Sequence, residues 1–140
     1  MEIKIKKLDE NAKLPEYAHP GDVGMDFFSI EEHTLKPGEH RAFKTGIAME
    51  FPIGYAAIVK DKGSMAHVGI HSMGGVFDAG YRGEYFIHLI NHGAKDFIVE
   101  KGRKIAQIII FPVEIPTLTE TNKLSDSARG EGRFGSTGKF

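Results

Sequence analysis

The sequence contains no cysteine. This absence excludes disulfide bonds, a thiol nucleophile and a thiolate metal site. The fold must therefore be held together by an apolar core, for which the 140 residues supply 41% hydrophobic side chains. A chain of this length suits a single domain.

Long hydrophobic runs are also missing. The apolar stretches fall far short of the ~18 residues that a membrane-spanning helix requires. The segment Met1–Lys7 alternates charged with aliphatic side chains and lacks the apolar centre of a signal peptide. We therefore expect a cytoplasmic protein without a membrane partner.

Neither sign of charge is in excess. The chain has 18 Lys and Arg residues against 19 Asp and Glu residues, which gives a formal net charge of -1. The broad basic surface that attracts long nucleic acids is absent, so no nucleic-acid partner is expected. A local basic cluster can still bind a small anionic ligand.

Alternation of apolar and polar residues with period two dominates the chain and predicts β-strands. In Phe43–Phe51 the odd positions form one face of a single predicted strand. Further strands are predicted at Tyr55–Lys60, Gly75–Asp78, Tyr85–Asn91, Asp96–Val99 and Ile105–Val113. Many short strands separated by Pro, Gly and Asn turns are typical of a β-sandwich or barrel. The only helix we expect is one turn at Ser64–Val68.

Two regions near the C-terminus differ from this pattern. Ile105–Val113 is nearly all apolar, which predicts a strand buried on both faces and favours an oligomer whose interface covers it. After Pro116 the apolar content falls, so we expect a core of residues 1–116 followed by a flexible arm, 117–140. The glycine-rich part of this arm, Arg129–Gly138, cannot bury enough surface to order itself without a ligand.

The composition of the arm suits a nucleotide. Its glycines let backbone amides converge on an anion, Arg129 adds charge, Ser136 and Thr137 add hydroxyl groups, and Phe134 adds one aromatic ring. Ordering ten residues costs on the order of 10–20 kcal/mol, whereas each charge-assisted hydrogen bond contributes about 1.5–3 kcal/mol. Such an arm is expected to close on a triphosphate and release a monophosphate. The alternative is a flexible tail without a function.

Asp78 is the strongest candidate for a catalytic group. It ends an apolar run at a glycine turn, where a carboxylate can face a cleft and yet be partly desolvated. This environment favours a general base. The alternative is an aspartate that only initiates the turn.

Taken together, these segments resemble the trimeric dUTPase family. Five short motifs of that family occur in the same order, from about residue 20 to the end: Gly24–Phe27, Asp61–Ala66, Gly75–Glu84, Gly102–Gln107 and Arg129–Gly138. Each motif alone is weak, but five in order at the expected spacings are highly specific.

The resemblance implies a role for each motif. Asp78 would activate a water that attacks the α-phosphorus of dUTP, giving dUMP and pyrophosphate, and Tyr81 would exclude a 2′-hydroxyl. Ser72, Gly75, Val76 and Phe77 would read uracil, with Phe86 lining the pocket. The residues that would bind the phosphates are Lys62, Gly63, Ser64 and Gln107. The arm would close over the substrate through Arg129, Gly135, Ser136 and Thr137, with Phe134 stacked on the base.

The resemblance also implies the assembly and the metal. The family fold is a β jelly roll, or distorted barrel, and three subunits of a homotrimer share each active site. Mg²⁺ would be held by the triphosphate and by water, with Asp26 assisting only through water.

Several positions depart from the family pattern. Lys62-Gly63-Ser64 stands where Arg-Ser-Gly or Arg-Ser-Ser is usual, and Lys104 replaces the usual arginine of the fourth motif. Ser72 occupies the place of an asparagine that lies near uracil in some members. A lysine offers a point charge in place of a bidentate fork, so we expect looser phosphate alignment.

Three alternative functions follow from the residues. The dCTP deaminase branch needs a glutamate on the strand after the aspartate hairpin, where this chain has His88. A second alternative is a nucleotide sensor without catalysis, and the presence of Asp78 argues against it. A transition-metal site at His67 and His71 is disfavoured by Gly69 between them and by the absence of a zinc-protease glutamate.

Overall fold

The computed structural model describes all 140 residues, and the chain is built almost entirely of strands. The strands are β1 (Lys4–Lys7), β2 (Met25–Phe28), β3 (His33–Leu35), β4 (His40–Phe43), β5 (Ile47–Glu50), β6 (Tyr55–Lys60), β7 (Ile70–Met73), β8 (Val76–Asp78), β9 (Ile87–Asn91), β10 (Phe97–Val99) and β11 (Lys104–Pro112). The single helix is α1 (Gly63–His67). The predicted all-β class is confirmed.

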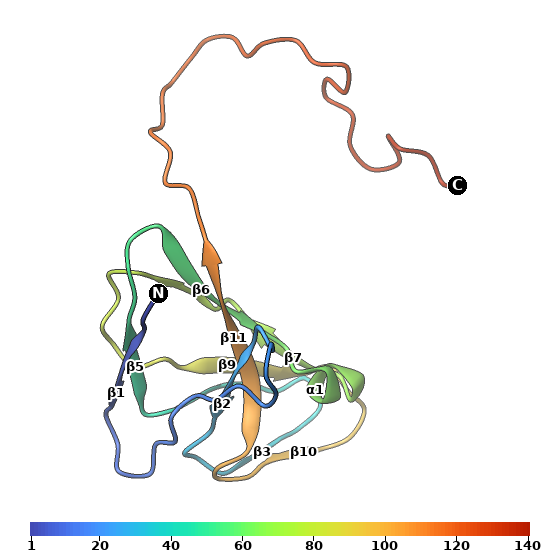
Figure 1. The fold of residues 1–140 in the computed structure, drawn as a ribbon. Coiled ribbons are helices and arrows are strands. Elements are labelled where there is room, and N and C mark those ends of the chain that lie inside the picture. The colour runs from blue at the N-terminus through green and yellow to red at the C-terminus, as the bar shows by residue number, and fades with distance from the viewer.

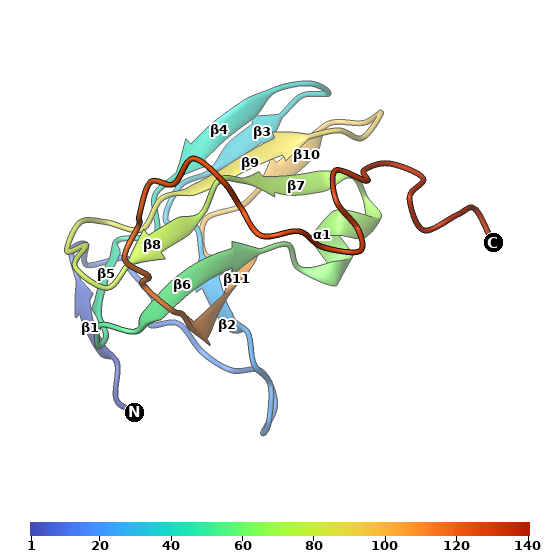
Figure 2. The ribbon, with the colours of Figure 1, turned by 90° about the horizontal axis from the view of Figure 1, so that it is seen from above.

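Two antiparallel sheets form the body of the molecule (Figure 1). One contains four strands in the order β2-β11-β6-β8, and the other contains three in the order β4-β9-β7. Figure 2 shows the two sheets along opposite sides of the barrel. Two smaller sheets of two strands each, β1-β5 and β10-β3, complete the barrel. Because strands distant in sequence are neighbours in both sheets, the chain crosses repeatedly between them, as in a jelly roll.

The core lies between the sheets and leads toward β8 through a column of aromatic rings. Tyr85 is fully buried and stacks on Phe77 of β8, with ring centroids 3.9 Å apart. The ring of Phe27 on β2 lies nearly parallel to that of Tyr85, with centroids 6.1 Å apart. Burial of a ring of this size stabilises the fold by about 1.5–3 kcal/mol. The column therefore anchors β8, the edge strand of its sheet, to the centre of the barrel.

The strand predicted over Phe43–Phe51 is wrong in one respect. These residues form two strands, β4 and β5, which pair in different sheets. Gly46 between them has a φ of 67°, a left-handed conformation that interrupts extended backbone. The odd-numbered side chains are nevertheless all buried, because the chain bends around one core.

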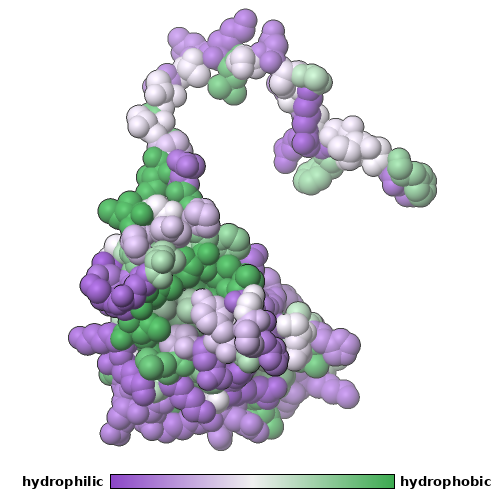
Figure 3. Space-filling view, viewed as in Figure 1, coloured by the Kyte–Doolittle hydropathy of each residue, from purple (hydrophilic) through white to green (hydrophobic).

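The single chain buries the inner half of Ile105–Val113 but not its outer half, the part that a subunit interface is expected to cover. Ile105 and Ile108 of β11 are at most 1% exposed, whereas Phe111 is 41% exposed. The outer half borders an apolar groove on the surface (Figure 3). Seven residues line this groove: Met1, Ile3, Tyr17, Val23, Ile109, Ile110 and Phe111.

Residues 113–140 contain no helix or strand, and all of them except Gly132 are exposed. In Figure 1 this segment leaves the end of β11 and arches away from the barrel. Only local turns organise it, such as the one in which the Ser136 N–H donates to the Arg133 carbonyl at 2.8 Å. No helix of the chain has the length and apolar character needed to cross a membrane.

Candidate active site

We call β7, β8 and the turn between them the hairpin; β7 pairs with β9 and β8 with β6, so the hairpin joins the two sheets. Its turn needs glycine at two positions. Gly74 and Gly75 have φ values of 65° and 90°, which residues with a Cβ rarely adopt. The Gly75 carbonyl accepts a hydrogen bond from the Val59 N–H at 2.8 Å. A Cβ on Gly75 would lie 2.5 Å from the Val59 Cβ, so the hairpin packs directly against β6.

Two clefts open beside this hairpin. The larger, about 700 Å³, is lined by Ile58, Val59, Lys60, Asp61, His71, Ser72, Met73 and Gly74. The smaller, about 250 Å³, is lined by Gly75, Val76, Phe77, Tyr81, Glu84, Phe86 and His88. The residues predicted to read uracil are therefore gathered around one hairpin, with Ser72 in the larger cleft and the others in the smaller.

Asp78 and Tyr81 lie on the same turn. Asp78 is the last residue of β8, and its carbonyl accepts the Tyr81 N–H at 3.0 Å. The Tyr81 hydroxyl donates to the Glu84 carbonyl at 3.0 Å, and its ring lies 5.8 Å from that of Phe77. The Tyr81 ring is thus held in place while 41% of the residue stays exposed. The Asp78 side chain is exposed in the single chain, and not partly desolvated as expected from the sequence.

The residues predicted to bind phosphate line neither cleft but lie next to Lys60 and Asp61 in the wall of the larger one. Gly63 and Ser64 begin α1, and Lys62 is its N-cap residue. Gln107 of β11 donates from its side-chain amide to the Asp61 carbonyl at 2.9 Å. A Cβ on Gly24 would overlap the Gln107 side chain, so the first motif packs directly against the fourth.

Asp26 forms the centre of a charge cluster that joins three motifs. Its carboxylate is 3% exposed and pairs with the ammonium groups of Lys62 and Lys104, the latter at 2.8 Å. Lys104 also pairs with Glu16 at 3.0 Å. Burial opposes ionisation of Asp26, but hydrogen bonds from Lys104 and Lys62 outweigh it and hold the pKa below its usual value. The two lysines that replace the usual arginines therefore converge on one carboxylate.

Asp61 has no role assigned from the sequence, yet it contacts the uracil hairpin. Its Oδ1 accepts hydrogen bonds from the Ser72 N–H and the Ser72 hydroxyl, both at 2.6 Å. Its Oδ2 lies 2.7 Å from Nδ1 of His71. Burial opposes ionisation of Asp61, but these hydrogen bonds lower its pKa. The only signal in the sequence was a carboxylate directly before Lys62.

The predicted arm residues gather together but do not reach the clefts. Arg129, Phe134, Gly135, Ser136 and Thr137 surround a concavity of about 410 Å³ within the arm itself, together with Arg133. Phe134 is 97% exposed, and Figure 1 shows the arm directed away from the barrel. Within one chain, the arm is therefore separate from the hairpin.

The fold defines an all-β protein of the jelly-roll class, with two clefts, an exposed carboxylate and a fixed aromatic ring at a sheet edge. Residues 10–138 match the family model described as dUTPase. The chain belongs to the dUTPase family.

Individual relatives agree with this assignment. The deoxyuridine 5'-triphosphate nucleotidohydrolase of Clostridium tetani is 49% identical over 140 residues, which cover 98% of this chain and 97% of the relative. The protein of the same name from Trichodesmium erythraeum is 45% identical, with 99% of both chains covered. A structure of the Staphylococcus bacteriophage 80alpha dUTPase with dUPNHPP superposes with a TM-score of 0.92 at 29% identity, with 99% of each chain covered. A phage phi11 dUTPase described with a structural Mg(II) ion has a TM-score of 0.83 at 25% identity, covering 90% of this chain and 100% of that one.

Proposed function

We propose that this chain hydrolyses dUTP to dUMP and pyrophosphate, which keeps uracil out of DNA and supplies dUMP. The observation that carries the proposal is the match to the dUTPase family over residues 10–138, which includes the turn with both Asp78 and Tyr81. The relatives named as deoxyuridine 5'-triphosphate nucleotidohydrolases extend over nearly the whole chain and support the same activity.

Asp78 is the general base of the proposed reaction. Its carboxylate takes a proton from a water molecule as the water oxygen bonds to the α-phosphorus. The bond from that phosphorus to the bridging oxygen then breaks, and pyrophosphate leaves with the bond's electron pair. Asp78 is exposed at the end of β8, so its carboxylate is accessible to a water molecule.

The hairpin selects the nucleoside. Tyr81 packs against the deoxyribose and leaves no room for a 2′-hydroxyl, a role supported by its fixed, partly exposed ring. Ser72, Gly75, Val76 and Phe77 contact uracil, with Phe86 at the wall of the smaller cleft. Close packing of Gly75 on β6 makes this wall rigid.

The phosphates bind along Lys62, Gly63, Ser64 and Gln107. Lys62 pairs with Asp26 in the single chain, so we propose that it exchanges this partner for a phosphate when the nucleotide enters. Lys104 keeps Asp26 neutralised during the exchange. Because phosphoanhydride cleavage depends mainly on positioning and charge neutralisation, this cluster contributes without touching the attacking water.

Magnesium enters this scheme with the substrate. Asp26 has both carboxylate oxygens close to lysine ammonium groups, and the chain has no group of three or more His, Asp or Glu side chains arranged as metal ligands. The residues therefore fit an ion that arrives on the triphosphate and keeps its waters. Asp26 would assist such an ion only through water, and the ion would help to neutralise the phosphate charge.

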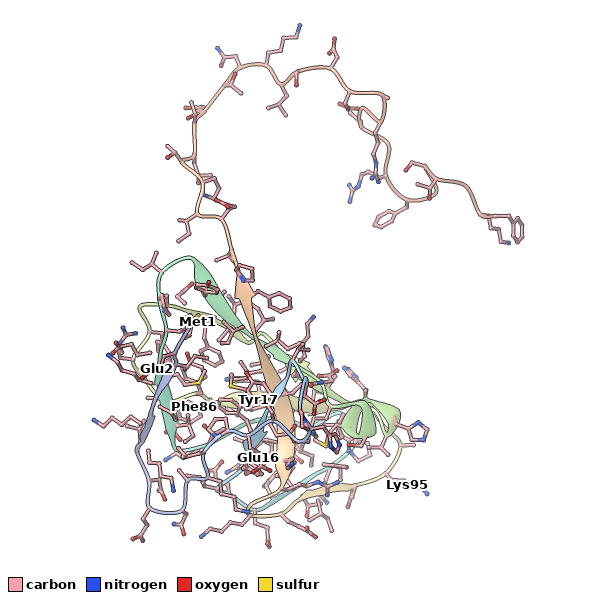
Figure 4. The ribbon with its side chains drawn as sticks, viewed as in Figure 1. Met1, Glu2, Glu16, Tyr17, Phe86 and Lys95 are labelled. Carbon is pink, nitrogen blue, oxygen red and sulfur yellow. The ribbon has the colours of Figure 1, made fainter.

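The active unit is proposed to be a homotrimer in which the arm completes the site of another subunit. The apolar groove beside β11 supplies a surface that needs cover, and Figure 4 places Tyr17 in this region. An arm that projects from its own barrel is able to reach a neighbour. There Arg129, Gly135, Ser136 and Thr137 close over the phosphates, and Phe134 stacks on uracil.

The proposal is tested by incubating the protein with each deoxynucleoside triphosphate and Mg²⁺, and measuring pyrophosphate. We expect release from dUTP alone. Asp78→Asn should bind dUTP but lose turnover by about 10²–10⁴-fold, whereas Asp96→Asn, an exposed aspartate away from the clefts, should be unaffected. Near-normal turnover by Asp78→Asn would refute the assigned base. Tight dUTP binding without turnover by the unmodified chain would instead point to a nucleotide sensor.

A further inference from the structure

Asp61 ties together two parts of the wall of the larger cleft. It lies between β6 and α1, and its Oδ1 accepts both the N–H and the hydroxyl of Ser72 on β7, eleven positions away, each at 2.6 Å. Ser72 is only 8% exposed, yet it lines the cleft together with Asp61. The Ser72 side chain is therefore fixed in a wall that a ligand meets.

The direction of the hydrogen bond follows from the chemistry of the two groups. A serine hydroxyl has one proton and two lone pairs, whereas an ionised carboxylate only accepts. The hydrogen bonds to Asp61 keep it ionised despite burial, since they hold its pKa below the usual value. The single proton of the Ser72 hydroxyl is thus committed to Asp61, and lone pairs are what the hydroxyl offers to a ligand.

We propose that Asp61 is a positioning residue for base selection, which holds the Ser72 hydroxyl as an acceptor that favours uracil over cytosine. Uracil carries a hydrogen on N3 that such an acceptor can bind, whereas N3 of cytosine carries a lone pair. To bind N3 of cytosine, the hydroxyl would have to turn and donate, which requires breaking its bond to Asp61. This inference rests on the proposed action on dUTP and names a determinant of its base selectivity.

An asparagine at position 61 separates this role from simple anchoring of the hairpin. Its amide oxygen can accept both hydrogen bonds from Ser72, and its NH₂ group can donate to an unprotonated ring nitrogen of His71. The Ser72 N–H requires an acceptor, so the introduced side-chain amide cannot turn its NH₂ group toward Ser72 without losing that hydrogen bond. Asp61→Asn therefore preserves the orientation of the hydroxyl, whereas Asp61→Ala releases it.

The experiment measures base selectivity in the full-length chain. The readouts are the KM for dUTP and the inhibition constant Ki of dCTP as a competitor, for the variants Asp61→Ala, Asp61→Asn and Ser72→Ala. We expect Asp61→Ala to lower the ratio of Ki(dCTP) to KM(dUTP) by about tenfold, and Asp61→Asn to keep it within about twofold of the unmodified chain. Ser72→Ala should also lower the ratio, and adding Asp61→Ala to it should change the ratio no further.

Controls distinguish the possible failures. Asp96→Ala, an exposed aspartate outside the cleft, should leave both constants unchanged, and thermal melting reports folding. If Asp61→Ala raises the KM and the Ki equally, Asp61 is only an anchor and the proposal is overturned. If Asp61→Ala does not fold, an unchanged ratio in Ser72→Ala overturns it. Absence of dUTP turnover in the unmodified chain refutes the proposed function as a whole, whereas turnover with unchanged ratios refutes this inference alone.

Discussion

Replacing Gly75 by alanine perturbs the hairpin at the point where it contacts β6. Gly75 has a φ of 90°, and the new Cβ would lie 2.5 Å from the Cβ of Val59 and 2.8 Å from one of its methyl groups. The Cβ of Val59 is fixed by the backbone of β6, so no side-chain rotation removes the shorter of these contacts. The substitution therefore adds a backbone strain and a steric overlap at once.

The two contributions can be estimated separately. An alanine held in a left-handed conformation costs about 1–2 kcal/mol, and forcing an extra carbon into a packed site costs about 1–3 kcal/mol. We expect Gly75→Ala to lower the free energy of unfolding by about 2–5 kcal/mol. A hairpin pushed away from β6 would also hold uracil less well, so the KM for dUTP should rise.

Gly54→Ala is a matched control for the backbone contribution. Gly54 has a φ of 93°, almost the same as Gly75, but a Cβ there meets no atom within 4 Å. We expect a loss of only about 1–2 kcal/mol and an unchanged KM. Urea unfolding, followed by far-ultraviolet circular dichroism, gives the free energy of unfolding of each variant, provided that the m-value is the same in both.

The difference in free energy of unfolding between Gly75→Ala and Gly54→Ala shows whether the contact with Val59 restrains the hairpin. If Gly75→Ala were no less stable than Gly54→Ala, the contact with Val59 would not restrain the hairpin, and the reasoning on a rigid cleft wall would fail. A similar stability with a raised KM would place the effect on the ligand alone.

Three further predictions concern the arm, the sugar and the core. Removal of Arg129–Phe140 should lower dUTP turnover by at least about a hundredfold but leave the melting temperature nearly unchanged, because these residues are almost all exposed. Tyr81→Ala should lower the Ki of UTP relative to the KM for dUTP by about tenfold, because the ring no longer excludes the 2′-hydroxyl. Tyr85→Phe removes a buried hydroxyl without a partner, so its free energy of unfolding should be equal or higher by about 1 kcal/mol. Burial raises the pKa of Tyr85 from 10.0 to about 12 because it disfavours the phenolate. The folded state is therefore most stable below pH 10 and loses stability as the pH rises toward 12, a loss absent in Tyr85→Phe.

Each of these predictions has a contrary result. A truncated chain that loses its cooperative melting would show that the arm supports the core. Unchanged inhibition by UTP would remove Tyr81 from sugar selection. Identical alkaline unfolding curves for the unmodified chain and Tyr85→Phe would mean that the phenol does not govern stability between pH 10 and 12.

Much of the fold could be predicted because its signal is local. Alternation of apolar and polar residues predicted β6, β8, β9, β10 and β11 to within about two residues, since neighbouring side chains of a strand point to opposite faces. It did not predict β7, a short strand between α1 and the glycine turn. The same rule placed Phe43 to Phe51 on one buried face but missed the break at Gly46. A left-handed glycine leaves the alternation intact while it redirects the chain into another sheet.

The sequence by itself determined the all-β class, the family through five ordered motifs, and the turn that carries Asp78 and Tyr81. The hydrogen bond of this turn joins two residues only three positions apart. Tertiary structure alone decided that Lys62 meets Asp26, 36 positions away, and that Asp61 holds Ser72. Side chains far apart in sequence leave no periodic trace, and a charged residue in a motif has several equally plausible partners. Which partner it contacts depends on how the two sheets bring β2, β6, β7 and β11 together, and that arrangement exists only in the folded chain.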